Sequence, residues 1–453
     1  MKLRAIDPDW AWSAFEPSQG TPWDLRSAAH LFRRAGFGAT WNQLGEAVKR
    51  KPAQVVDQLV SADTEPEAFR SEMESLVEAS LATDNVKRLS AQWVYRMLTT
   101  PTPVLEKMTL FWHGHFATSA SKVTDAELMQ RQNDLLREYA LGDFSRLLLE
   151  ISRDPAMLLY LDSATNRKAH PNENFAREIM ELFCLGEGNY SEQDIRELAR
   201  CFTGWEIKRK RFRFNRYQHD GGTKKVLGSD VLSGEEGVAV VASQDDAPRF
   251  IVRKLIRFFV FDEPQAPSEL IEPLAQEMRQ NEMQVAPTVR RILASNLFHS
   301  PQARGRKVRS PVEFGIGFLR VLEGSTDSFQ LADSLEQLGQ GLYYPPSVKG
   351  WDGGRTWINS STLLGRANLI RRLIDGGKTR FGKQSIDDYL KSNDIHSSAD
   401  LIDRLETTLF AVQIPPSARK QIADLDAGSD GNAASRVKDV VHVLCTLPEF
   451  QLA

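Results

Sequence analysis

The sequence is poor in cysteine: only Cys184, Cys201 and Cys445 occur, and no two of them form a CxxC pair. Each lies in an apolar helical pattern, which favours buried free thiols over redox or metal-binding groups. Long hydrophobic runs are also missing. No stretch approaches the roughly 20 apolar residues that cross a bilayer, and the N-terminus lacks the apolar core of a secretory signal. We therefore expect a cytoplasmic protein without a membrane partner.

The chain also lacks a large excess of one charge, because 57 basic residues face 60 acidic ones and the net charge is −3. This balance creates no global field that would steer nucleic acid, so no nucleic-acid partner is expected. Several catalytic motifs are absent as well, namely a Walker-type phosphate loop, GxGxxG, HExxH, GxSxG and a paired-cysteine zinc pattern. The familiar nucleotide-dependent, zincin and α/β-hydrolase mechanisms are therefore disfavoured.

Helical periodicity dominates from Asp24 onward, with frequent capping residues and few alternating segments. The composition, 41% hydrophobic and 26% charged, is that of an ordinary globular protein. The sequence predicts a predominantly all-α, multi-helix globular bundle. It also predicts one small β-hairpin or irregular insertion near 209–228, and a long aromatic and glycine-rich loop near 341–361.

A length of 453 residues exceeds what one core usually supports, so two to three structural units are expected. We predict an N-terminal helical region, 1–205, that carries a central pair of helices. A second region, 206–375, contains the hairpin and the aromatic loop and shares one core with the first. Residues 376–453 are expected to form a C-terminal helical bundle.

His113 and His115 lie at the end of an apolar helix, in the run Phe-Trp-His-Gly-His-Phe. Side chains two apart on a helix face nearly opposite ways, but Gly114 permits a break that would turn both imidazoles toward one point. Such a pair would hold a transition metal, with iron, manganese or zinc preferred over calcium. The aromatic neighbours favour the alternative, in which each imidazole is partly buried and bonds a carbonyl or carboxylate group.

The central pair consists of a helix over 172–185 and a second helix that begins at a capping box, Ser191 with Asp194. The short connection between the two helices predicts antiparallel packing. The polar residues of the first helix are Asn172, Glu173, Arg177, Glu178 and Glu181. If the polar strips of the two helices meet, they form either a functional site or a structural network of paired charges, and the sequence leaves both open.

Two loops carry further candidates. His219 and Asp220 precede paired glycines and Lys224, a combination that offers acid/base and anion-binding groups but also suits a surface turn. The 341–361 segment contains Trp351 and Asp352 and is too aromatic for a free linker. Packed on the central helix pair, it would form the wall or lid of a cleft; otherwise it would fill the core.

Several of these blocks occur in a fixed order, among them the runs that begin at His30 (HLFRRAGFG), Phe111 (FWHGHF), Asn172 (NENFAREIMELF) and Lys349 (KGWDGG). Together they resemble a bacterial family named only as domain of unknown function 1800, over roughly 22–372. The resemblance implies no established activity. It does imply a partner that resembles sulfatases and alkaline phosphatases and is encoded nearby, and hence a polysaccharide, sulfated or phosphorylated substrate. Some relatives are exported, unlike the location expected here.

Our leading hypothesis is an enzyme for an anionic or carbohydrate-type substrate, with a site where the central helices, the histidine block and the His219 loop meet. The residues assigned to catalysis are Glu178, Glu181, His219 and Asp220. Those assigned to substrate binding are Asn172, Glu173, Arg177, Lys224, Trp351 and Asp352, with His113 and His115 as metal ligands. The competing hypothesis is a non-catalytic binding or assembly protein that partners the sulfatase- or phosphatase-like protein. The oligomeric state is left open.

Overall fold

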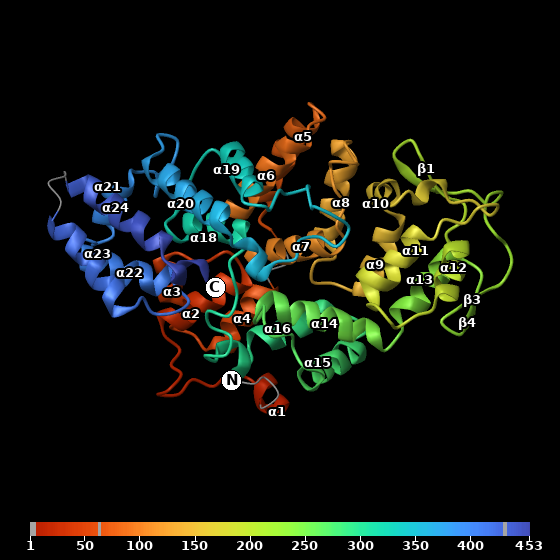
Figure 1. The fold of residues 1–453 in the computed structure, drawn as a ribbon, viewed down its shortest axis with the longest axis horizontal. Helices are drawn as coiled ribbons and strands as arrows, with labels where there is room; N and C mark the ends of the chain where they lie inside the picture. The colour runs from red at the N-terminus through yellow and green to blue at the C-terminus, as the bar shows by residue number, and fades with distance from the viewer. Residues whose placement is uncertain (1–5, 62–64, 429–432) are drawn as a thin grey trace.

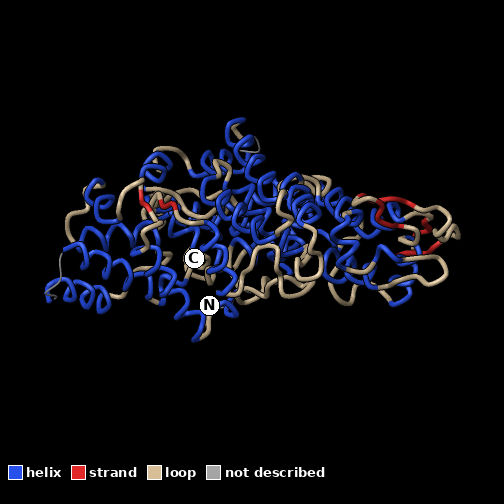
Figure 2. Tube along the Cα trace, turned by 90° about the horizontal axis from the view of Figure 1, so that it is seen from above, coloured by secondary structure: helices blue, strands red, loops and turns tan. Residues whose placement is uncertain are grey.

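The computed structural model describes residues 6–61, 65–428 and 433–453, and these ranges contain 24 α-helices and three small two-stranded sheets. The predominantly all-α prediction is confirmed. Figure 1 shows an elongated molecule whose C-terminal helices lie at one end and whose first two hairpins lie at the other. All strands are short; Figure 2 shows most of them at one end of the molecule and the remaining pair among the helices near the other end. None of the helices in the described ranges combines the length and apolar composition that crossing a bilayer requires.

The first eight helices build the centre of the molecule. They are α1 (Pro8–Trp12), α2 (Leu25–Ala35), α3 (Trp41–Ala47), α4 (Pro52–Ser61), α5 (Glu67–Leu81), α6 (Val86–Thr99), α7 (Pro103–His115) and α8 (Ala126–Glu138). Helix α7 is the most enclosed of them, because all of its residues except Leu105 and Gly114 are buried. A helix that is apolar nearly all round lies in the core of a large protein, and α7 does so here.

The next segment builds the end of the molecule that carries the hairpins. Its helices are α9 (Phe144–Arg153), α10 (Pro155–Tyr160), η2 (Ser163–Thr165), α11 (Asn174–Glu178), the π-helix η3 (Ile179–Cys184), α12 (Glu192–Cys201) and α13 (Gly234–Ala242). The predicted capping box at Ser191 and Asp194 is present. The predicted helix over 172–185 is α11 continued by η3.

Two hairpins occupy the region where one was predicted. Strand β1 (Trp205–Lys208) pairs with β2 (Arg211–Phe214), and β3 (Lys224–Val226) pairs with β4 (Ser229–Val231), both antiparallel. The first turn has positive φ at Arg209 and Lys210, which are residues that give no turn signal in the sequence. The glycine pair at 221–222 lies in the connection between the hairpins and not in a hairpin turn.

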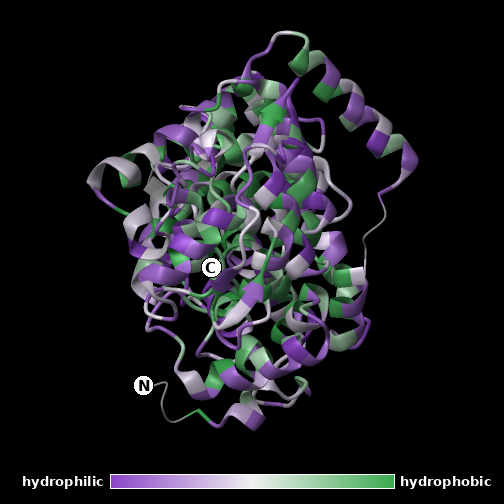
Figure 3. Cartoon of the chain, turned by 90° about the vertical axis from the view of Figure 1, so that its right-hand side faces the viewer, coloured by the Kyte–Doolittle hydropathy of each residue, from purple (hydrophilic) through white to green (hydrophobic). Residues whose placement is uncertain are grey.

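The remaining elements complete the centre and form the C-terminal end. They are α14 (Asp246–Phe259), α15 (Ser268–Gln280), α16 (Val285–Leu293), α17 (Asn296–His299), α18 (Pro311–Val321), α19 (Ser328–Gln337), η4 (Gly354–Trp357), α20 (Ser360–Asp375), α21 (Ile386–Ser392), α22 (Ser398–Leu409), α23 (Pro416–Gly428), α24 (Ala433–Thr446) and η5 (Pro448–Gln451). Strand β5 (Gly324–Ser325) pairs with β6 (Arg380–Phe381). Figure 3 shows hydrophilic and hydrophobic residues interleaved along the surface helices.

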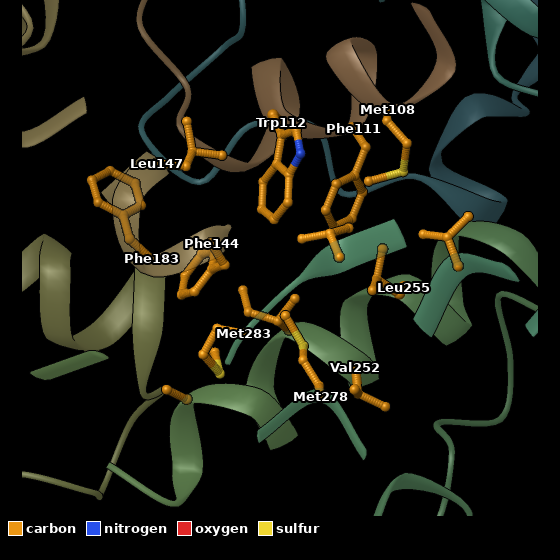
Figure 4. Packing of buried hydrophobic residues seen from close by; sticks show 14 of the residues in the cluster. Met108, Phe111, Trp112, Phe144, Leu147, Phe183, Val252, Leu255, Met278 and Met283 are labelled. Atoms are coloured by element: carbon orange, nitrogen blue, oxygen red, sulfur yellow. The ribbon is translucent and has the colours of Figure 1, made fainter. Parts of the chain in front are cut away.

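Buried apolar residues form two cores that meet at α7. One core joins residues from Ile6 to Ala303, and the other joins α6 and α8 to the helices from α18 onward. In Figure 4, Phe111 and Trp112 point from α7 toward Val252 and Leu255 of α14, whereas Leu110 belongs to the other core. The three cysteines are buried and free, as predicted. The division into three regions stays a prediction, because the two cores both include residues of α7 and so define no domain boundary.

Candidate functional site

The two histidines of α7 face different partners. The helix continues through Gly114 to His115, so the break that would have turned both imidazoles to one point does not exist. Tyr343 N donates to His113 Nε2 over 3.0 Å, whereas His115 Nε2 donates to the carbonyl of Phe183 over 2.9 Å. Both side chains are buried, and burial lowers the pKa of His113 to about 3. His113 and His115 therefore match the alternative given above, in which each imidazole is buried and forms its own hydrogen bond.

The donor set at these histidines does not fit a metal ion. His113 Nε2 already accepts a hydrogen bond, and His115 Nε2 carries a proton that bonds a carbonyl. Among the residues that the structure describes, no group of three or more His, Cys, Asp and Glu side chains is placed to hold a metal ion. We therefore assign no iron, manganese or zinc to His113 and His115.

The charged residues of the central helix pair bond mainly to one another. Arg177 forms a two-pronged ion pair with Glu192, at 2.7 and 2.8 Å, and lies 3.6 Å from Glu173. Tyr190 donates to Glu181 over 3.1 Å. The side chain of Asn172 donates to the Asp162 carbonyl, which ties down the start of α11. These contacts give a structural role to residues that were also predicted to bind substrate.

Glu178 is the acid of this pair that faces the aromatic loop. Partial burial and the nearby Glu181 raise its pKa, and the positive charge of Lys349 opposes that rise. The structure thus brings the middle of the α11–η3 helix close to the 341–361 segment. One turn further along, the Phe183 carbonyl accepts from His115 of α7, and the Leu182 carbonyl accepts from Lys254 of α14.

The His219 loop lies elsewhere. Both ring nitrogens of His219 lie within 3.0 Å of backbone carbonyls, those of Thr203 and Leu232. Asp220 pairs with Arg200 at 2.7 Å, and the Lys224 amine donates to the Asp220 and Leu232 carbonyls. Within the described ranges, none of these three side chains bonds to α7, α14 or the aromatic loop. A role of His219, Asp220 and Lys224 in catalysis or binding stays a prediction. These residues do not line the cavity described next.

A cavity of about 210 Å³ lies where α7, α14, the 307–313 segment and the aromatic loop meet. Its cationic lining residues are Lys254, Arg257, Lys307 and Lys349, and its acidic ones are Asp262, Glu313 and Asp352. Aromatic rings from Phe111, Phe258, Trp351 and Trp357 complete the walls. A mostly apolar hollow with a few convergent charged groups is the usual form of a small-molecule site.

The aromatic loop lines this cavity and packs against α7, beside which it runs in Figure 1. At Gly350 the backbone approaches α7 so closely that an added Cβ would lie 2.0 Å from the Gly114 carbonyl oxygen. The Trp351 ring packs 5.6 Å from the His113 ring, and Arg257 donates to the Asp352 carbonyl over 2.6 Å. The Trp351 Nε1 atom is buried without a hydrogen-bond partner, so a donor remains unused beside the cavity.

Gly350→Ala tests this attachment. Its φ of +73° disfavours a side chain, and the new methyl group would collide with the Gly114 carbonyl, so we expect a loss of at least about 2 kcal/mol in the free energy of unfolding. Urea denaturation followed by circular dichroism measures it. Gly377→Ala is the matched control, because no atom lies within 4 Å of its added Cβ, and its change should stay below about 0.5 kcal/mol. Equal losses in the two variants would contradict a close contact at Gly350.

Two buried ion pairs support the floor of the cavity. Lys307 contacts Asp262 at 2.5 Å and also donates to the Arg257 carbonyl, and Lys107 of α7 contacts Glu313. The neighbouring lysines lower the pKa of Glu313 to about 2, although its burial acts in the opposite direction. Both pairs are nearly inaccessible to solvent, so these charges neutralise each other and connect α7, α14 and α18.

The other three basic side chains of the cavity form no ion pair with the described residues, although Lys349 lies near enough to Glu178 for its charge to act on that carboxyl group. Among the described residues, no carboxylate lies within ion-pair distance of Lys254, Arg257 or Lys349. Asp352 also lines the cavity, but its side chain is exposed and forms no ion pair. The local balance is therefore positive, in contrast to the slightly negative chain as a whole.

Lys254 is a cavity residue that the sequence analysis missed. Its amine lies 3.0 Å from His115 Nδ1 and 3.1 Å from the Leu182 carbonyl oxygen. Burial, reinforced by the charge of Arg257, lowers the pKa of Lys254 to about 7. In the sequence it looks like one more basic residue on an amphipathic helix, and only its position one turn after Phe250 hinted that it faces inward.

The family model described as protein of unknown function (DUF1800) matches residues 30–452. The chain belongs to this family. The resemblance predicted from the sequence blocks is confirmed, and the match extends beyond 372 into the C-terminal helices, where no block was recognised. No curated protein and no solved structure matches the chain.

Three of the four DUF1800 blocks named from the sequence meet at or beside the cavity. The block that begins at Phe111 and the block that begins at Lys349 both line the cavity. The block that begins at Asn172 supplies the carbonyls to which His115 and Lys254 donate. For this DUF1800 chain, the cavity is thus the place where sequence blocks far apart in the chain come together.

Proposed function

We propose that the cavity is the active site of an enzyme that acts on a small anionic compound, one that bears a carboxylate, phosphate or sulfate group. The observation that carries this proposal is the presence of two cavity cations, Arg257 and Lys349, that form no ion pair within the described residues. Positive charge that the protein does not neutralise itself favours an anionic ligand. Arg257 and Lys349 are exposed, so an incoming ligand can reach them from solvent.

Proton transfer in this enzyme takes place at the Lys254 amine. A group with a pKa of about 7 is present in both protonation states near neutral pH, which suits a general acid or base. His115 positions the amine through the 3.0 Å hydrogen bond at Nδ1. The rings of Trp351 and Trp357 offer flat apolar surfaces on which a sugar ring of a carbohydrate-type substrate would stack.

A second candidate is a non-catalytic binding or assembly protein that partners a sulfatase- or phosphatase-like protein. It is favoured by the central helix pair, in which Arg177, Glu192 and Glu173 form ion pairs with one another at the surface. If this second function is correct, a substitution of Lys254 would leave the activity of the complex with the sulfatase- or phosphatase-like protein unchanged.

Anion binding tests whether the cavity is the site at which the protein binds its ligand. Calorimetric titration and thermal unfolding with inorganic phosphate, sulfate and citrate should show binding to the isolated protein. Arg257→Met and Lys349→Met should each weaken binding by about tenfold or more, because each removes a charged hydrogen-bond donor. Lys225→Met is the matched control, since Lys225 is an exposed lysine that does not line this cavity. If Arg257→Met and Lys349→Met bind the anion as tightly as the control and the wild-type protein, the anion binds outside the cavity and the proposal is wrong.

A further inference from the structure

We propose that Lys254 is a nucleophile that forms an imine with the carbonyl group of a small oxo acid bound in the cavity. This proposal rests on the proposed function, because it takes the cavity as the active site. It names the substrate class, an aldehyde or ketone that also carries a carboxylate, and the atom that attacks it.

The hydrogen bonds of His115 determine how the Lys254 amine is held. A carbonyl oxygen can only accept, so the contact of His115 Nε2 with Phe183 places the imidazole proton on Nε2. Nδ1 is then an acceptor, and Lys254 must donate to it. The Leu182 carbonyl accepts a second hydrogen bond from the same amine. A neutral amine has two N–H groups and one lone pair, so both N–H groups are used and the lone pair stays free.

The surroundings of Lys254 favour the neutral amine. No carboxylate in the described part of the chain lies within ion-pair distance of it. The titratable groups around it are His115 from α7, Arg257 from its own helix, and Lys307, Lys349, Asp262 and Asp352 on the other cavity walls. Burial and Arg257 lower its pKa to about 7. A lysine freed of its proton by burial near another cation is a common way to activate an amine nucleophile.

The other cavity groups select an oxo acid. Arg257 and Lys349 are cations that form no ion pair within the described residues. A carboxylate satisfies both, because it is an anion that accepts several hydrogen bonds. The volume of about 210 Å³ suits a compound of a few carbon atoms.

The reaction balances without any co-reactant other than a proton. The Lys254 nitrogen attacks the carbonyl carbon, a C–N bond forms, and the π electron pair moves to the oxygen. The nitrogen then loses a proton and the oxygen gains one, which gives a carbinolamine. The hydroxyl group takes a further proton from solvent and leaves as water, and the nitrogen lone pair forms the C=N bond of a protonated imine.

Reductive trapping tests the proposal with glyoxylate as the probe. Glyoxylate and cyanoborohydride should convert Lys254 into carboxymethyl-lysine, located by peptide mass spectrometry. At neutral pH we expect labelling of Lys254 to exceed that of the exposed Lys225 and Lys349 by about tenfold or more, because a pKa near 7 leaves far more free amine. Lys254→Arg should lose this label while still binding phosphate, since it removes the nucleophilic amine but leaves Arg257 and Lys349 in place.

Protection of Lys254 from labelling by phosphate is measured on the wild-type protein. The test therefore remains valid if the Lys254→Arg variant does not fold. Saturating phosphate should reduce labelling of wild-type Lys254 by about tenfold and leave Lys225 unaffected. Phosphate binding in the cavity with labelling of Lys254 no faster than that of exposed lysines would overturn the imine and leave the proposed function standing. Neither phosphate binding nor selective labelling would overturn both.

Discussion

Glu106→Gln is expected to reduce the free energy of unfolding by about 3–5 kcal/mol, which is the cost of breaking a buried ion pair by removing one partner. Glu106 is completely buried in α7. Its Oε1 accepts from Arg96 and Arg137, each at 2.6 Å, and its Oε2 accepts from Trp93 Nε1 at 2.8 Å. The two arginines lower the pKa of Glu106 to about 2 against the effect of its burial. A neutral amide at this position would leave two guanidiniums facing each other.

Glu46→Gln is the matched control for Glu106→Gln. Glu46 pairs with Lys49 at 2.6 Å, but both side chains are about two-thirds exposed, at 68% and 66%. Exposed pairs of this kind contribute little, so we expect a change of less than about 1 kcal/mol. Urea denaturation curves of the two variants provide the comparison. Similar midpoints for both would mean that the network around Glu106 does not hold α6, α7 and α8 together.

Stability is expected to fall steeply when the pH drops below about 6.5. Four buried histidines have pKa values lowered by burial: His30, His113, His115 and His299. In the unfolded chain they take up protons below their ordinary pKa of about 6.5, whereas the folded protein keeps them neutral to a much lower pH. Each therefore removes about 1.4 kcal/mol per pH unit in this window. Their contribution is fully present above pH 6.5 and is lost as the pH falls.

Several acids act in the opposite direction, because burial raises the pKa of Asp134, Asp154, Glu178 and Asp387. Burial raises the pKa of Asp154 to about 7, so the folded protein binds a proton there that the unfolded chain does not bind above its ordinary pKa of about 3.8. The stability from this group grows as the pH falls from about 7 to about 4, which offsets roughly one histidine. The net slope below pH 6.5 is therefore smaller than the four histidines alone would give. Glu106 and Glu313, with pKa values of about 2, lose their contribution only at lower pH.

His299→Gln isolates one of these sites. His299 Nε2 donates to the Leu293 carbonyl over 3.0 Å, a bond that a glutamine amide can replace. Urea denaturation at several pH values between about 7 and about 5 should show a slope smaller by about 1.4 kcal/mol per pH unit. His396→Gln is the control, because that side chain is 68% exposed and should leave the slope unchanged. A flat profile for the wild-type protein in this range would refute the prediction.

Local features of the fold followed from the sequence because they depend on residues a few positions apart. The capping box at Ser191 and Asp194 is one, and the enclosure of the aromatic run in α7 is another. The first hairpin was misplaced because its turn at Arg209 and Lys210 uses residues that rarely adopt positive φ. The candidate site was only partly anticipated: Trp351 and His115 line the cavity, but Lys254 was not among the candidates.

By itself, the sequence determined the helical class of the protein, most of its helix starts, its free cysteines and its membership of the DUF1800 family. Hydrophobic periodicity and helix capping depend on residues a few positions apart, so both can be recognised in the sequence. Only the tertiary structure decided which polar residues share a cavity and which neutralise one another. Lys254 meets His115 across 139 positions of chain, and its pKa depends on burial and on neighbours that the sequence does not place beside it.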